Sequence, residues 1–98
     1  MPEFNSIQNV YTPLRKLTPN EILRAIKFSI SAEFEAIQLY QQIMENTNNK
    51  DVIKALSEIT EDEKKHAGGL YKLLEILSPE DEKKYQAGAK EILEEIAK

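Results

Sequence analysis

Three residues with metal-binding side chains, Glu33, Glu63 and His66, fall where the surrounding pattern predicts apolar residues. Each belongs to a stripe with spacings of three and four, the repeat that keeps side chains on one face of a helix. The first stripe contains Glu33 together with Ile26, Ile30, Ile37, Tyr40 and Met44. The second contains Glu63 and His66 together with Ile53, Leu56, Ile59, Leu70, Leu73 and Leu77. Because an unpaired buried carboxylate is costly, these stripes predict a compensating cation, and a metal ion is the simplest one.

Glu63 and His66 form a Glu-x-x-His motif, whose spacing places a carboxylate and an imidazole side by side within reach of one ion. The motif alone is common on exposed helices, and its place in an apolar stripe is what favours metal binding. Glu33, on a neighbouring helix, adds a third ligand of a type that iron accepts. Two interpretations without metal stay open. Glu63 and His66 could form a buried hydrogen-bonded pair that fixes helix register, and Glu33 could be an edge residue whose carboxylate reaches solvent.

The number of these ligands predicts a site shared between two chains. A carboxylate-bridged di-iron centre in a four-helix bundle takes a Glu from each of two helices and a Glu-x-x-His from each of two others. The chain has one such motif and a single histidine, so it supplies half of a centre. Two copies related by a two-fold axis supply the whole. We therefore expect a homodimer that binds two irons between its subunits.

Helix-start signals indicate the elements that must position these residues. Thr18-Pro19-Asn20-Glu21 combines an N-cap hydroxyl, a proline in the first turn and an acid three residues after the cap. It predicts a helix that ends near Glu45 or Asn46. The turn-forming residues 46–49 offer the next N-cap, so a second helix is expected from about Lys50 to Leu77. Ser78-Pro79-Glu80 repeats the start signal for a shorter third helix that reaches about Ala97.

A connection of about four residues makes the first two helices antiparallel neighbours, each roughly 40 Å long. We predict an all-α fold: an antiparallel two-helix hairpin plus a short C-terminal helix, completed to a four-helix bundle by dimerisation. Residues 1–17 show no sustained periodicity and are expected to be an irregular N-terminal arm. Residues 18–98 are expected to form one helical domain.

Composition narrows the chemistry and the partners. The 98 residues contain no cysteine, so a metal site must use carboxylate and imidazole, and disulfides and iron–sulfur clusters are excluded. A net charge of −4, from 17 acids and 13 bases, argues against nucleic acid as a partner. No apolar run approaches the roughly 20 residues of a membrane span, and Met1-Pro2-Glu3-Phe4 does not resemble a signal peptide. We expect a cytoplasmic protein without a membrane partner.

Two segments resemble a known family. Residues 32–40, Ala-Glu-Phe-Glu-Ala-Ile-Gln-Leu-Tyr, are followed about thirty positions later by residues 61–67, Glu-Asp-Glu-Lys-Lys-His-Ala. Together they are similar to the encapsulated ferritin-like proteins, the ferroxidase cargo of encapsulin nanocompartments. The resemblance covers roughly residues 18–97. It implies a ferritin-like bundle made by two paired chains, and assembly of the pairs into a ring, typically a decamer.

The resemblance also implies a function, the oxidation of Fe(II) to Fe(III) with oxygen for iron storage and detoxification inside an encapsulin shell. Glu33, Glu63 and His66 match the iron ligands of the family, Tyr40 matches a residue close to the centre, and Glu35 matches an acid that gathers iron on its way in. The expected location is then the lumen of a cytoplasmic shell. Members reach it through a C-terminal targeting peptide or by fusion to the shell protein, and the sequence indicates neither route.

Two positions depart from the family pattern. Ala32 stands where some members carry another acid of the uptake site, and Leu39 stands where some carry a tryptophan, so an auxiliary iron site is not predicted. Two other functions fit the same residues. One is a rubrerythrin-like peroxidase that depends on an external reductant, because no cysteines are present to form an electron-transfer domain. The other is a non-catalytic module in which zinc or calcium joins two chains.

Overall fold

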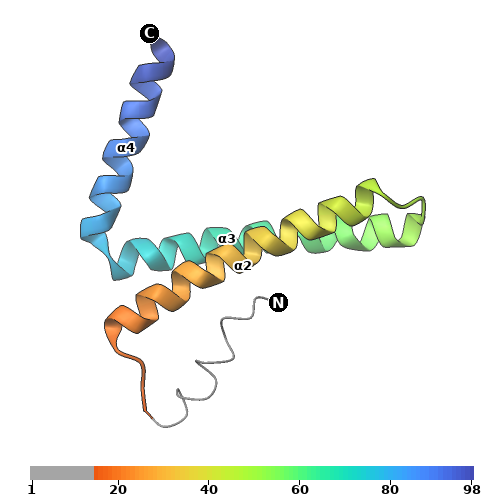
Figure 1. Ribbon diagram of the computed structural model, residues 1–98, viewed down its shortest axis with the longest axis horizontal. Coiled ribbons are helices and arrows are strands. Elements are labelled where there is room, and N and C mark those ends of the chain that lie inside the picture. The colour runs from red at the N-terminus through yellow and green to blue at the C-terminus, as the bar shows by residue number, and fades with distance from the viewer. Residues whose placement is uncertain (1–14) are drawn as a thin grey trace.

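The computed structural model describes residues 15–98, which form three helices: α2 (Pro19–Glu45), α3 (Lys50–Leu77) and α4 (Pro79–Ala97) (Figure 1). No strand occurs within these residues, which confirms the predicted all-α class. Most of the predicted N-terminal arm, residues 1–14, lies outside the described residues, so the division of the chain at residue 17 stays a prediction. None of the three helices is long and apolar enough to cross a membrane.

The first two helices begin where their caps dictate. The Thr18 hydroxyl accepts a hydrogen bond from the Glu21 N–H at 3.2 Å, and the Glu21 carboxylate accepts one from the Thr18 N–H at 2.8 Å. This reciprocal pair satisfies two backbone donors at the start of α2. The Asn49 side chain accepts from the N–H groups of Asp51 and Val52 at the start of α3. Both helix starts were predicted from these residues and are confirmed.

The junction between α3 and α4 is the one place where the predicted capping is wrong. Ser78 does occupy the N-cap position of α4, but its hydroxyl makes no capping hydrogen bond. Its backbone N–H donates to the Leu74 carbonyl at 3.0 Å, and its carbonyl accepts from the Glu82 N–H at 3.1 Å. One residue therefore both ends α3 and begins α4, and its backbone geometry is set by that double role.

The helices α2 and α3 pack side by side and antiparallel, as predicted (Figure 1). Every buried side chain among residues 15–98 comes from this hairpin. The buried residues are Ile30 and Ile37 of α2 and Thr60, Ala67 and Leu74 of α3. In both helices they recur every seven residues, close to two turns, so the contact follows a narrow line along the hairpin.

The helix α2 covers only part of the apolar stripe predicted for α3. Within the single chain, Leu56, Glu63 and Leu70 are half-buried, but the other members of the stripe are exposed: Ile53, Ile59, His66, Leu73 and Leu77. The residues that face α2 most closely lie slightly around the helix from the predicted stripe. Apolar spacing identifies the face of a helix that avoids water, but it does not tell which part of that face one neighbouring helix covers.

The third helix, α4, turns away from the hairpin at the end of α3 (Figure 1). It contributes no buried residue. Its apolar side chains are all exposed, from Tyr85 near its start to Ile96, which is 76% exposed. The helix is therefore held to the rest of the described chain mainly through its junction at Ser78.

Candidate metal centre

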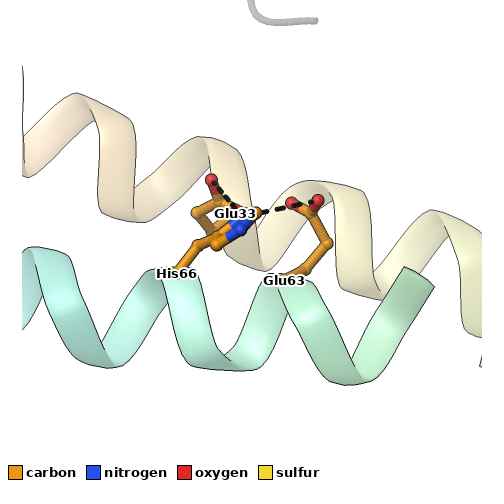
Figure 2. Close-up of side chains that lie close together, drawn as sticks. All are labelled: Glu33, Glu63 and His66. Atoms are coloured by element: carbon orange, nitrogen blue, oxygen red, sulfur yellow. Dashed lines mark ion pairs between the residues drawn. The ribbon is translucent and has the colours of Figure 1, made fainter. Parts of the chain in front are cut away.

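The three predicted ligands converge halfway along the hairpin. Glu33 projects from α2 towards Glu63 and His66 of α3, which lie one helical turn apart (Figure 2). One ligand atom from each of the three side chains lies within 4.8 Å of the others. The Nδ1 atom of His66 is 3.8 Å from an oxygen of Glu33 and 3.8 Å from an oxygen of Glu63. The antiparallel register therefore brings together residues that are thirty positions apart in the sequence.

The two glutamates are held close together and mostly out of water. Their side chains are 20% and 21% exposed, and the Oε2 atom of Glu33 is buried without a hydrogen-bond partner. Hydrogen bonding to the neighbouring Glu63 carboxylate, helped by burial and by the like charge of Glu63, raises the pKa of the Glu33 carboxyl. His66 acts in the opposite direction on the same group. An acceptor without a partner beside a second carboxylate and an imidazole is a donor set that fits a divalent metal such as iron.

His66 differs from the two glutamates in its exposure. Its side chain is 60% exposed, so the cluster is closed on the α2 side and open on the other. Two exposed apolar residues of α3 lie on this open side about two turns from His66, Ile59 before it and Leu73 after it. Exposed apolar side chains on both sides of a ligand cluster are typical of a surface that contacts another chain.

The two secondary candidates, Glu35 and Tyr40, also belong to α2, and Glu35 is not a member of this cluster. Among residues 15–98 the metal-binding group contains only Glu33, Glu63 and His66. Glu35 is exposed on α2, and Tyr40 is half-buried two turns after Glu33. Both line a depression on α2, next to Ala32. The roles expected for Glu35 and Tyr40 beside the three ligands stay predictions.

One polar residue of the hairpin was not singled out from the sequence. Thr60 is 4% exposed, and its hydroxyl has no hydrogen-bond partner. It precedes Glu63 by one turn on the face of α3 that packs against α2. The available signal was its spacing: Leu56, Thr60, Glu63 and Ala67 follow one another at steps of four, three and four, so Thr60 occupies a core position of the stripe beside the predicted one.

Two proteins similar in sequence to this chain are named for encapsulins, in agreement with the resemblance noted in the sequence. The chain is 34% identical over 80 residues to EncC, an encapsulin nanocompartment cargo protein of Myxococcus xanthus, a match that covers 82% of this chain and 60% of that protein. It is 32% identical over 77 residues to a ferritin-like–encapsulin shell fusion protein of Pyrococcus furiosus, covering 79% of this chain and 22% of the fusion. The matches thus span less than two thirds of either relative.

The fold has a close counterpart of known structure. The crystal structure of an encapsulated ferritin domain from Pyrococcus furiosus superposes with a TM-score of 0.78 at 31% identity, and the match covers 82% of each chain. This confirms the ferritin-like fold and the resemblance to encapsulated ferritin-like proteins. The sequence pattern of the rubrerythrin family matches residues 24–98, which include all three ligand candidates. The chain therefore belongs to the rubrerythrin family, and it has the ferritin-like fold of that domain.

Proposed function

We propose that this protein is a ferroxidase that oxidises Fe(II) to Fe(III) with oxygen at a di-iron centre shared by two copies of the chain. The observation that carries the proposal is the cluster of Glu33, Glu63 and His66, whose ligand atoms lie within 4.8 Å of one another in a mostly apolar seam. Two carboxylates and an imidazole suit iron in either oxidation state better than they suit a purely structural role, because Glu33 keeps a buried oxygen without a partner.

Dimerisation follows from the ligand count. One chain supplies two carboxylates and one imidazole, whereas a carboxylate-bridged di-iron centre in a four-helix bundle uses four carboxylates and two imidazoles. The exposed side of His66 and the apolar residues beside it are where the second copy would complete the set. The contact would bury Ile59 and Leu73 at the same time, so the apolar face and the incomplete site have one common explanation.

Each residue of the cluster has a role in handling the substrate iron. Glu33 and Glu63 would hold the ferrous ions through their carboxylates, and His66 would add an imidazole ligand. The pKa of Glu33 is raised by hydrogen bonding to Glu63, by burial and by the like charge of Glu63, and a cation held by both carboxylates would offset that repulsion. Two bound ferrous ions would supply two electrons to oxygen, which with two protons from solvent gives hydrogen peroxide and two Fe(III), while the chain keeps its ligands fixed.

We further propose that the protein works inside an encapsulin shell. The support is the likeness to EncC, named as an encapsulin cargo protein, and to a protein in which a ferritin-like part is fused to an encapsulin shell. A ring of such chains, with a decamer as the expected size, has no mineral store of its own, so a surrounding shell would hold the ferric product. Glu35, exposed on α2, is the residue we assign to gathering ferrous iron.

Oxygen consumption on addition of ferrous iron tests the enzymatic proposal. The parent protein should consume oxygen rapidly, and Glu63→Ala should reduce the rate about 100-fold or more because it removes a ligand from both halves of the site. Glu58→Ala, which changes an exposed acid of the same helix, is the matched control and should behave as the parent. An undiminished rate in Glu63→Ala would rule out this cluster as the oxidation site.

The same experiment separates the two rival functions. A module in which zinc or calcium only joins two chains would bind metal without oxygen consumption. A rubrerythrin-like peroxidase would instead consume hydrogen peroxide in the presence of an external reductant, and faster than it consumes oxygen. The family match leaves room for that second activity, whereas the absence of cysteine means that its reductant must come from elsewhere.

A further inference from the structure

Thr60 buries a hydroxyl that has no partner. The residue is 4% exposed, and its Oγ1 atom makes no hydrogen bond. Only one other side-chain atom among residues 15–98 is buried in this way, the Oε2 atom of Glu33. Because an unsatisfied buried hydroxyl is unfavourable, valine would be the more stable residue at this position on packing grounds alone.

Helical hydroxyls normally avoid this cost within their own helix. Ser29 of α2 does so, since its hydroxyl donates to the Ala25 carbonyl four residues earlier at 2.8 Å. Thr60 has the same option towards the carbonyl of Leu56 and does not use it. The difference indicates that the Thr60 hydroxyl is oriented for some other acceptor.

The spacing along α3 makes Glu63 the candidate acceptor, although the two side chains are not hydrogen-bonded in the metal-free chain. It lies one turn after Thr60 on α3, where side chains three residues apart are neighbours at about 5–6 Å between Cβ atoms. Helical side chains lean towards the N-terminus of their helix, which directs the Glu63 carboxylate over the turn that contains Thr60. Across the seam, the antiparallel register places Ile37 of α2 one turn beyond Glu33, and this buried residue offers no polar group.

We propose that Thr60 is a positioning residue of the metal centre, whose hydroxyl donates a hydrogen bond to the Glu63 carboxylate when that carboxylate is a metal ligand. Ligating carboxylates keep free lone pairs, and a neighbouring donor fixes their orientation. In the metal-free chain the hydroxyl has no partner. The hydrogen bond forms when metal binds, so it increases the affinity for the metal. This inference rests on the proposed metal site, but it does not depend on ferroxidase activity.

The test compares metal affinity with the stability of the metal-free protein in the full chain. Cobalt(II), which keeps its oxidation state during the titration, is the probe for calorimetry, and thermal unfolding of metal-free protein gives stability. The variants are Thr60→Val, which replaces the hydroxyl with a methyl group of the same size, and Thr60→Ser, which keeps the hydroxyl. Ser57→Ala removes an exposed hydroxyl from the same helix and is the matched control.

A positioning role predicts that loss of the hydroxyl lowers the cobalt affinity but does not lower the thermal stability of the metal-free protein. Thr60→Val should weaken cobalt binding about 10-fold while the metal-free protein unfolds at the same or a higher temperature. Thr60→Ser should stay within about 3-fold of the parent affinity despite its lost methyl group, because it retains the donor. Ser57→Ala should match the parent in both measurements.

Three results would overturn the role of Thr60 while leaving the metal site intact. They are parent-like affinity in Thr60→Val, equal losses of affinity in Thr60→Val and Thr60→Ser, and a Thr60→Val protein that loses affinity and thermal stability together. A parent protein that binds no cobalt would have a different meaning, because it would remove the proposed metal centre along with its positioning residue.

Discussion

The α2–α3 hairpin and α4 are both amphipathic, but they use their apolar residues in opposite ways. The hairpin contains every buried side chain found among residues 15–98, including Ile30, Ile37 and Leu74. In α4 the corresponding side chains remain in water, with Ile92 and Ile96 among the most exposed apolar residues of the chain. A helix with a regular apolar stripe and no partner for it among residues 15–98 has a surface suited to a contact outside those residues.

The same contrast separates two neighbouring sides of α3. One side packs on α2 and carries Thr60, Ala67 and Leu74, whereas the neighbouring side carries exposed Ile59 and Leu73. The ligand cluster lies at the border, with Glu63 mostly buried and His66 mostly exposed. If the proposed shared centre is correct, the hairpin, the outer side of α3 and α4 should contribute to it in different ways.

The largest effect should come from His66, the ligand on the open side of the cluster. We expect His66→Ala to weaken binding of ferrous iron or zinc about 100-fold, because each copy of the chain loses its only imidazole. Calorimetry on metal-stripped protein in two buffers of different ionisation enthalpy measures both affinity and proton release. Lys65→Ala, at the exposed position next to it, is the control. Unchanged binding in His66→Ala would remove histidine from the ligand set.

A charge on the outer side of α3 should disrupt the site without touching a ligand. Leu73→Glu places a carboxylate in the proposed contact between two chains, where burial of an unpaired charge is unfavourable. We expect association to weaken about 10-fold or more and metal affinity to fall with it, because binding and assembly are linked when two chains share the ligands. Sedimentation velocity with and without metal measures the linkage. Parent-like metal affinity in a monomeric Leu73→Glu protein would show that one chain binds the ion alone.

The equivalent charge on α4 should have a smaller and different effect. Ile92 is 61% exposed and lies on a helix that contributes nothing to the ligand cluster. We expect Ile92→Glu to keep the metal affinity within about 3-fold of the parent, since the hairpin and its outer side are intact. Any change should appear instead as a loss of the largest assemblies in sedimentation. If Ile92→Glu weakened metal binding as much as Leu73→Glu, the distinction between the two surfaces would be lost.

The sequence predicted the local features of this molecule well, and the reason is physical. Helix bounds depend on caps such as Thr18 with Glu21, which act over three or four residues and are visible as a motif. The convergence of Glu33 with Glu63 and His66 followed from a short connection and regular spacing. The helix bounds and the convergence of the three ligands can both be predicted without knowing which helix covers which face.

Features that depend on the partner of a face were harder to predict. An apolar stripe on α3 gave no indication that Ile59 and Leu73 stay exposed while Ala67 is buried, because the choice depends on the packing angle between helices. The absence of buried residues in α4 has the same cause. Thr60 was missed because a buried threonine is usually satisfied within its own helix.

The smallest effect should be found at the start of α2, where one ion pair reinforces the cap. The Arg15 guanidinium donates two hydrogen bonds to the Glu21 carboxylate at 2.6 and 2.7 Å, and the Thr18 N–H donates a third at 2.8 Å. These bonds, chiefly those from Arg15, lower the pKa of Glu21 from 4.5 to about 2. Because the pair is at the surface, its contribution is modest and is weakened by salt.

The direction of the pH effect follows from that lowered pKa. A carboxyl group that holds its proton less tightly in the folded chain stabilises the fold fully above its unfolded pKa of 4.5, and the contribution fades as pH falls from there towards 2. Glu21→Gln removes the charge, so it should increase amide exchange at Ile22, whose N–H donates to the Thr18 carbonyl at 2.9 Å, near neutral pH. At pH 3 the difference from the parent should be smaller. A difference in amide exchange that stays constant across this pH range would show that the ion pair does not stabilise the helix start. Glu33 lies three turns further along α2, so the metal affinity of Glu21→Gln should equal that of the parent.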